Sequence, residues 1–193
     1  MFPREIETDR LRLERLCHDT VDVYEYYELW ATAHPEVFEH LSATPFATVK
    51  EASDEIDDAE TFWDDGHTAT YLVRPKEGEA HAGVLAGRTS LDCEWDRGVG
   101  RLGIMLSRPF WGRGYSGERA GALLELAFER LHLSVVSVNH RDGNERSRRA
   151  IEKYVDEYGG QYDGVKRDAR TPDEIEIHHR YSVTRAEYRD AVG

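Results

Sequence analysis

The chain has 193 residues, of which 38 are Asp or Glu and 25 are Lys or Arg, so its formal net charge at pH 7 is −13. This length suits one α/β domain with a sizeable core. The acidic balance argues against a nucleic-acid backbone as the main partner, because clustered lysines and arginines drive that binding. An acidic, lysine-poor composition is typical of a high-salt cytoplasm, where exposed charges are strongly screened, and it fits an ordinary acidic protein equally well.

The cysteines and the N-terminus exclude other classes of protein. Cys17 and Cys93 stand far apart and belong to no Cys-x-x-Cys or Cys/His cluster, so we expect neither a disulfide framework nor a metal site. The N-terminal residues Met-Phe-Pro-Arg-Glu lack an apolar signal region, and no apolar run approaches the roughly 18 residues of a membrane helix. These features predict a cytoplasmic protein without a membrane partner.

The first half of the chain predicts two helices and four strands. Residues 10–14 alternate between apolar and polar and indicate a strand, and residues 19–31 indicate a helix with one apolar face. Thr48 and Glu51 form a capping box for a second helix that reaches Trp63. Residues 69–74, 82–90 and 101–106 indicate three consecutive strands, which loop-like segments join into a meander.

The second half begins with a glycine-rich loop over residues 108–118. We expect a helix over 118–131, a strand over 134–139, a helix over 145–157, and closing strands over 161–166 and 174–183. Because no linker, internal repeat or low-complexity segment interrupts this order, we predict one domain over residues 1–193.

The glycine-rich loop is the most informative segment, because it opens an apolar helix directly after a strand. Backbone N–H groups and the helix dipole favour a phosphate at such a helix start. The glycines also match the dinucleotide fingerprint G-x-G-x-x-G, which requires an acidic residue about 20 positions later, at the tip of the next strand. The first acid after that strand is Asp142, which is misplaced. The motifs of a kinase are missing too, and a plain tight turn remains the alternative.

Residues 111–116, Trp-Gly-Arg-Gly-Tyr-Ser, resemble the pyrophosphate loop of the GCN5-related N-acetyltransferases (GNAT). The resemblance is to their RimJ/RimL branch in particular, which acetylates the N-termini of ribosomal proteins. Other segments resemble the same branch in the right order. Residues 7–13 are similar to its opening strand, residues 144–147 to its Asn-x-x-Ser helix start, and residues 180–188 to its closing strand and tail.

This resemblance implies a single-domain α/β (α+β) GNAT fold, with a mixed, mostly antiparallel sheet of six to seven strands, a splayed parallel pair and flanking helices. It implies acetyl-CoA as the cosubstrate and no metal. The main chain of Met105 and Leu106 would pair with the pantetheine arm, and Asn144 would lie beside that arm, although a plain helix N-cap is the alternative for Asn144. The pyrophosphate would contact the loop residues Trp111, Gly112, Arg113, Gly114, Tyr115, Ser116 and Gly117.

The resemblance also suggests catalytic residues. Ser147 would lie near the thiol as a proton donor. Many family members carry a tyrosine acid seven positions after the asparagine, where this chain has Ile151, so Tyr154 on nearly the same helix face is the second candidate. The glutamate that RimL-like chains often carry on the splayed strand is Arg101 here, so the general base stays unassigned. The residues considered for it are Glu94, Asp96, His140, Glu176 and His178.

We therefore predict an acetyl-CoA-dependent N-acetyltransferase that acts on a primary amine by direct attack in a ternary complex. A protein N-terminal α-amine is the favoured acceptor, and a small-molecule amine is the alternative. A non-catalytic acyl-CoA-binding module is a third possibility, because the usual glutamate is absent. A homodimer is a candidate assembly.

Overall fold

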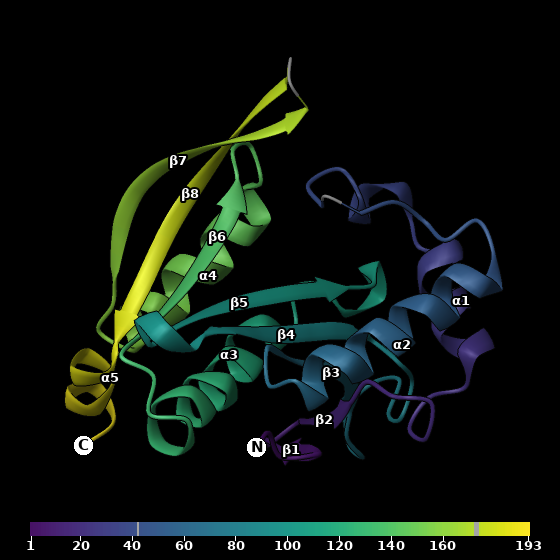
Figure 1. Cartoon of the computed structure of the whole chain (residues 1–193), viewed down its shortest axis with the longest axis horizontal. Coiled ribbons are helices and arrows are strands. Elements are labelled where there is room, and N and C mark those ends of the chain that lie inside the picture. The colour runs from purple at the N-terminus through teal and green to yellow at the C-terminus, as the bar shows by residue number, and fades with distance from the viewer. Residues whose placement is uncertain (42, 172–173) are drawn as a thin grey trace.

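The computed structural model describes residues 1–41, 43–171 and 174–193, and helices flank its sheet (Figure 1). The strands are β1 (Glu5–Glu7), β2 (Leu11–Arg15), β3 (Thr68–Pro75), β4 (Gly87–Glu94), β5 (Val99–Leu106), β6 (Val135–Arg141), β7 (Gln161–Thr171) and β8 (Glu174–Thr184). The helices are α1 (Val23–Ala31), α2 (Val49–Asp64), α3 (Tyr115–Glu125), α4 (Glu145–Glu157) and α5 (Arg185–Val192). Short helical turns form η1 (Pro35–Val37), η2 (Trp95–Arg97) and η3 (Arg108–Phe110), and a π-helical segment, η4 (Leu126–Arg130), extends α3.

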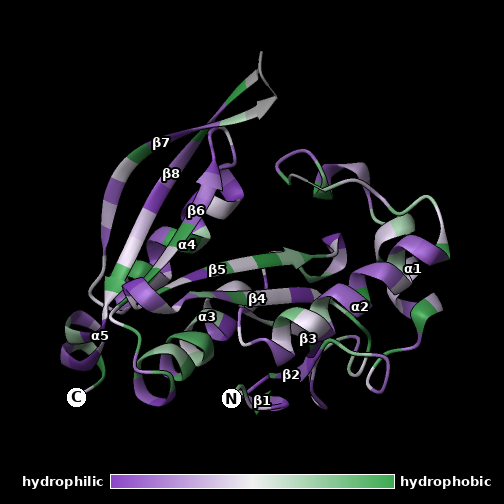
Figure 2. Ribbon diagram, viewed as in Figure 1, coloured by the Kyte–Doolittle hydropathy of each residue, from purple (hydrophilic) through white to green (hydrophobic). Residues whose placement is uncertain are grey.

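The eight strands form one sheet in the order β1-β2-β3-β4-β5-β6-β8-β7. Apolar and polar residues alternate along its central strands (Figure 2), as expected for strands with two different faces. In β3, Tyr71 and Val73 pack into the core that α3 and α4 cover, whereas Leu72 packs into the core that α1 and α2 cover. Because β3 is buried on both faces, it reads in the sequence as a nearly continuous apolar run.

The pair β5 and β6 is parallel, and it separates halfway along its length (Figure 1). The paired residues run from Val99 opposite Val135 to Leu102 opposite Val138. Beyond that point β5 continues to Leu106 and β6 to Arg141, but these two strands no longer pair with each other. The backbone of β5 between Gly103 and Leu106 is therefore free of β6, which confirms the expected splayed parallel pair within a mixed, mostly antiparallel sheet.

The sheet has eight strands, whereas six to seven were expected. The additional strand is β1, which is only three residues long and therefore too short to show alternation in the sequence. The strand expected from Ala82 begins at Gly87 instead. His81 and Gly83 adopt positive φ angles of 63° and 76°, and these angles turn the chain before the strand can start. The helix expected from Glu118 begins at Tyr115, directly after Gly114 at φ 83°.

The C-terminal part contains more secondary structure than expected, because β7 is longer than expected and an additional helix, α5, is present. β7 and β8 pair as a long hairpin from Gln161 opposite Ser182 onward, and α5 follows β8. The Oγ1 of Thr184 accepts a hydrogen bond from the backbone N–H of Glu187, whose carboxylate accepts one from the backbone N–H of Thr184. This capping box starts α5. Within the described residues, none of the helices combines the length and apolar character that a membrane span requires.

Candidate functional site

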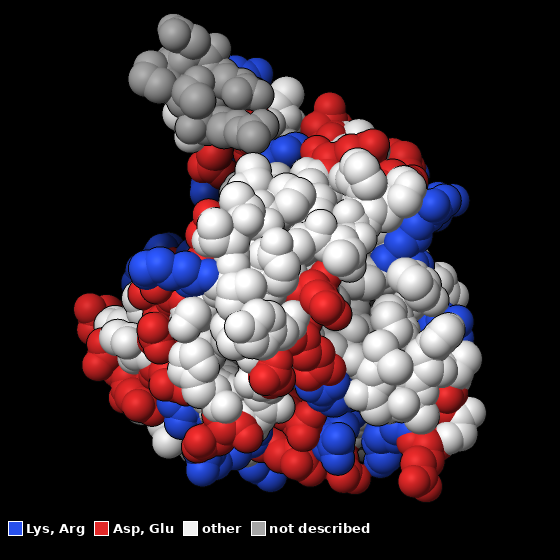
Figure 3. Space-filling view, turned by 90° about the vertical axis from the view of Figure 1, so that its right-hand side faces the viewer, with Lys and Arg blue, Asp and Glu red and all other residues white. Residues whose placement is uncertain are grey.

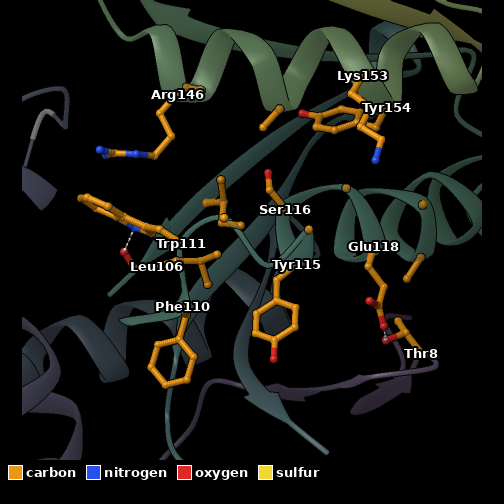
Figure 4. Close-up of a pocket in the computed structure, with 18 of the residues that line it drawn as sticks. Thr8, Leu106, Phe110, Trp111, Tyr115, Ser116, Glu118, Arg146, Lys153 and Tyr154 are labelled. Carbon is orange, nitrogen blue, oxygen red and sulfur yellow. Dashed lines mark hydrogen bonds between the residues drawn. The ribbon is translucent and has the colours of Figure 1, made fainter. Parts of the chain in front are cut away.

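A cavity of about 1100 Å³ lies where the glycine-rich loop, the free end of β5, α4 and the segment that follows α1 meet (Figure 4). Nearly all of the residues predicted from the sequence line it. They are Met105, Leu106, Trp111, Gly112, Gly114, Tyr115, Ser116, Gly117, Asn144, Ser147 and Tyr154. Arg113 does not line the cavity, because its Nε donates to the carbonyl of Pro109, 3.0 Å away. The side chain of Arg113 therefore points away from the cavity, and this residue contributes to the loop through its backbone.

The loop presents unoccupied backbone N–H groups toward the cavity. Gly112 and Gly114 have φ angles of 74° and 83°, in the left-handed region that glycine adopts without strain. A Cβ atom placed on Gly112 would meet no heavy atom within 4 Å, so this glycine faces open space. Gly114 is the N-cap of α3, and no side chain of the described residues caps that helix start. The backbone N–H groups of Tyr115 and Ser116 are therefore free to bind an anion such as a diphosphate, whereas that of Gly117 donates to the Gly114 carbonyl at 3.1 Å.

The loop is braced from the turn between β1 and β2 by hydrogen bonds to Glu118. The carboxylate of Glu118 accepts hydrogen bonds from the Oγ1 of Thr8 (2.5 Å) and from the backbone N–H and the Nε of Arg10 (2.7 Å each). Arg10 also donates through Nη1 to the carbonyl of Arg113 at 2.9 Å. Burial raises the pKa of Glu118, but the hydrogen bonds from Thr8 and Arg10 together hold it below its usual value. A charged Glu118 thus fixes the start of α3 to the turn between β1 and β2.

The cavity has two ends on either side of the loop. Gly121, Glu125 and Tyr158 line the end between α3 and α4, whereas Ile104 and Leu106 line the end at the free part of β5. A ligand whose phosphates bind the loop and whose arm lies along β5 places its reactive group at this second end. We call it the acyl end.

Aromatic and charged side chains close the acyl end. The indole Nε1 of Trp111 donates to the carbonyl of Leu106 at 2.7 Å (Figure 4). The guanidinium carbon of Arg146 lies 3.7 Å from the centroid of the Trp111 indole. Glu36, in η1, pairs with both Arg146 and Arg108 at 3.4 Å. The segment over residues 34–41 is thereby tied to the loop and to α4.

The proposed proton donors occupy different positions on α4. Asn144 is the N-cap of α4, since its Oδ1 accepts from the backbone N–H of Ser147 at 3.0 Å. That geometry fits the plain N-cap alternative and still leaves the Ser147 hydroxyl at the cavity wall. Figure 4 shows the ring of Tyr154 above the loop, but its hydroxyl oxygen is buried, so the cavity is lined by the rest of this side chain. The structure therefore brings both side chains to the same cavity.

Tyr154 lies beside a buried charge. Arg119 is completely buried on α3, and none of its guanidinium nitrogens makes a regular hydrogen bond to a described residue. Burial raises the pKa of the Tyr154 phenol, and the neighbouring Arg119 guanidinium opposes that shift. Because the positive charge favours the phenolate, Arg119 makes Tyr154 a better acid than burial alone would allow.

The residues considered for the general base from sequence do not reach the cavity. Glu94 pairs with Arg97 and Arg101 at 2.9 and 3.4 Å. His140 is buried with its ring nitrogens directed at the Arg141 carbonyl and the Tyr181 hydroxyl. The remaining considered residues, Asp96, Glu176 and His178, are also absent from the cavity lining. In the described part of the chain, no group of His, Cys, Asp and Glu side chains could hold a metal.

Sequence reasoning missed the residues of the 34–41 segment, because no local motif marks them. It also missed the roles of Thr8 and Arg10, although the segment that contains them was singled out as an opening strand. A helix start suited to phosphate, set beside a strand with a free backbone edge, is the arrangement expected of a transferase that uses an acyl-CoA. The comparisons with known proteins identify the family.

The family model described as the acetyltransferase (GNAT) domain matches residues 10–154. The chain therefore belongs to the GNAT acetyltransferases, which use acetyl-CoA. The N-acetyltransferase p20 of Bacillus licheniformis, whose own function is uncharacterised, is 27% identical over 161 residues, which is 83% of this chain and 84% of that protein.

Solved structures share the same fold. A provisionally named acetyltransferase from T. thermophilus is 27% identical with a TM-score of 0.75, over 99% of this chain and 94% of that one. The microcin C7 self-immunity acetyltransferase MccE, solved with acetyl-CoA and AMP, is 14% identical with a TM-score of 0.80, over 95% and 97%. A provisionally named ribosomal-protein-serine acetyltransferase from Vibrio cholerae is 18% identical with a TM-score of 0.75, over 95% and 99%.

Proposed function

We propose that this acetyltransferase transfers the acetyl group of acetyl-CoA to a primary amine, with a protein N-terminal α-amine as the favoured acceptor. The observation that carries this proposal is the uncapped start of α3 beside the free edge of β5, in one continuous cavity. The acceptor preference rests on the four segments that resemble the RimJ/RimL branch. The name of the Vibrio cholerae structure agrees with it but, at 18% identity, contributes only the fold.

We assign each part of the cosubstrate to a part of the cavity lining. The amides from Gly112 through Gly117 would hold the pyrophosphate, and the ammonium of Lys153, which Figure 4 shows pointing into the cavity from α4, adds a positive charge near it. The main chain of Met105 and Leu106 would bind the pantetheine arm. Met105 itself packs into the core of α1 and α2, so its contribution is limited to its backbone.

Acetyl transfer needs few groups once the reactants are aligned. A neutral amine attacks the thioester carbonyl, the C–N bond forms, and the C–S bond breaks as the tetrahedral intermediate collapses. The leaving thiolate is stabilised by a proton, which the Ser147 hydroxyl or the Tyr154 phenol would deliver. Acetyl-CoA supplies the activated acyl group, and the protein supplies alignment and proton transfer.

The wider setting is part of the same proposal. We propose that residues 1–193 form one acetyltransferase domain that works in the cytoplasm, either alone or as a homodimer. Its acidic composition, with basic and acidic side chains intermixed on the face shown in Figure 3, suits a high-salt cytoplasm.

A panel of acceptors tests the function. The purified protein is mixed with acetyl-CoA and either short peptides with free N-termini, the same peptides with blocked N-termini, or small primary amines, and the release of free CoA thiol is measured. We expect release with free peptide N-termini and none with blocked ones. Release only with small amines would support the small-molecule alternative, and acetyl-CoA binding without release for any acceptor would indicate a non-catalytic module.

A further inference from the structure

We propose that His40 is the general base that removes a proton from the acceptor amine. This inference rests on the proposed amine acetylation. It concerns the one catalytic role for which the sequence indicated no residue, since Arg101 stands where related chains often carry a glutamate.

Position in the molecule favours His40 over the other histidines. The chain has nine histidines, all within the described residues, and His40 is the one among them that lines the cavity. His18, His178 and His179 interact elsewhere with Asp57, Glu176 and Asp142, respectively. His140 is buried on the sheet face that packs against α4. A base must lie within hydrogen-bond reach of the amine, so location alone disfavours these side chains.

The acidic residues of the cavity lining are less suitable as the base. Glu36 is at the acyl end, but one of its carboxylate oxygens is paired with Arg108 and the other with Arg146, at 3.4 Å each. Glu118 is committed to Thr8 and Arg10. The remaining acidic residues of the lining lie away from the acyl end, on β1 and the turn after it, on α3 and on α4; they are Glu7, Asp9, Glu125 and Glu157.

Tertiary contacts hold His40 at the acyl end. A Cβ atom placed on Gly143 would lie 3.9 Å from the Cε1 of His40, so the imidazole packs against the turn that leads into Asn144. The neighbouring backbone is tied to the same turn, because Arg141 donates through Nη1 to the carbonyl of Glu39 at 3.4 Å. His40 therefore faces the region where Asn144 and Ser147 would border the thioester.

The imidazole is also free to accept a proton. His40 is half-buried, and neither of its ring nitrogens makes a hydrogen bond to a described residue. The charged groups on the elements that meet around it are Glu36 and Glu39 on its own segment, Arg141 at the end of β6, Asp142 in the turn that follows, and Arg146 on α4. Imidazole is the side chain whose chemistry best suits proton transfer near neutral pH.

Two protons leave the acceptor nitrogen in this reaction. Neutral His40 takes one proton from the ammonium form of the acceptor, which leaves a neutral amine whose lone pair forms the C–N bond. The C–S bond then breaks as Ser147 or Tyr154 donates a proton to the thiolate, and that donor is reprotonated by the second proton that the new amide nitrogen must lose. The imidazolium afterwards releases its proton to solvent. The products are the amide, free CoA and one proton for each turnover.

The test compares His40→Gln with His178→Gln, a histidine outside the cavity that the sequence also suggested. We expect His40→Gln to lower kcat/KM at pH 7 by about 100-fold or more and to remove the acidic limb of its pH profile. Acetyl-CoA affinity by calorimetry should be unchanged, and added imidazole should restore part of the rate. His178→Gln should keep the wild-type rate and profile.

Other outcomes would overturn the assignment. A wild-type rate and pH profile in folded His40→Gln would refute the base while leaving acetylation intact, and a matching loss in His178→Gln would show that the effect is not specific to the cavity. His40→Asn replaces His40→Gln if the latter fails to fold. If the wild-type protein releases no CoA with any amine, the proposed function itself fails, and this role fails with it.

Discussion

Alanine at Gly114 tests whether the loop binds the pyrophosphate through its backbone. Gly114 has a φ angle of 83°, and an alanine in the left-handed region costs about 1–2 kcal/mol. Its Cβ atom would also lie 3.3 Å from the Nη2 of Arg10, which braces the loop through Glu118. The free variant can relax this strain by turning its amides away, but a bound pyrophosphate requires them in place. The strain therefore opposes binding.

The expected loss follows from that strain. Because about 1.4 kcal/mol corresponds to a tenfold change in Kd, Gly114→Ala should weaken acetyl-CoA binding about 5- to 30-fold. Titration calorimetry measures the affinity, and circular dichroism with a melting curve shows that the variant is folded. The strain alone should lower the melting temperature by about 2–4 °C for each kcal/mol in a chain of this size.

Gly78→Ala is the matched control. Gly78 has a φ angle of 96°, and a Cβ atom placed on it would meet no heavy atom within 4 Å. It lies in the β3–β4 connection outside the cavity lining. Its alanine variant should lose similar stability and keep wild-type affinity. Wild-type affinity in folded Gly114→Ala would refute the loop assignment, and an equal loss in both variants would show that affinity reports only general destabilisation.

Three further predictions concern charge, the leaving thiolate and acid stability. The melting temperature should rise from low to molar KCl, since ions screen the self-repulsion of a chain with a net charge of −13; a flat or falling curve would contradict the high-salt hypothesis. Ser147→Ala should lower kcat at unchanged acetyl-CoA affinity and Tyr154→Phe should be mild, whereas the reverse ranking in steady-state kinetics would transfer the donor role to Tyr154. Burial lowers the pKa of His140, so the unfolded chain binds its proton more readily and stability should fall as the pH drops below about 6.5. Urea unfolding of His140→Gln should show a weaker fall between pH 7 and pH 5, and an unchanged fall would exclude this residue as the cause.

Local signals explain why much of the fold could be predicted from the sequence. The Thr48 and Glu51 pattern predicted the start of α2, and the Oγ1 of Thr48 does accept from the backbone N–H of Glu51 at 3.3 Å. The corresponding pattern of Thr184 and Glu187 starts α5, which the sequence reading missed because it treated that segment only as the tail of a strand. Backbone turns were harder, since the positive φ angle of His81 has no marker in the side chain itself.

The two halves of the site differ in how far the sequence defines them. The phosphate loop is contiguous in sequence, and its glycines, its helix start and its preceding strand follow one another, so a short motif predicts most of it. The acyl end is assembled from residues more than 100 positions apart, as in the contact of Arg146 with Glu36. No periodicity or spacing reports such a contact, and this is why His40 became visible only in the structure.

Contacts at the acyl end join the segment that carries His40 to the backbone of β5. Glu36 belongs to that segment, whereas its partner Arg146 rests on Trp111, whose indole N–H occupies the carbonyl of Leu106. The Leu106 carbonyl is one of the backbone groups that the pantetheine arm would use. Because half-exposed ion pairs of this kind contribute only about 0–1 kcal/mol, the pairs of Glu36 add little to the stability of this end, and the Trp111 hydrogen bond is the contact that the arm would have to displace.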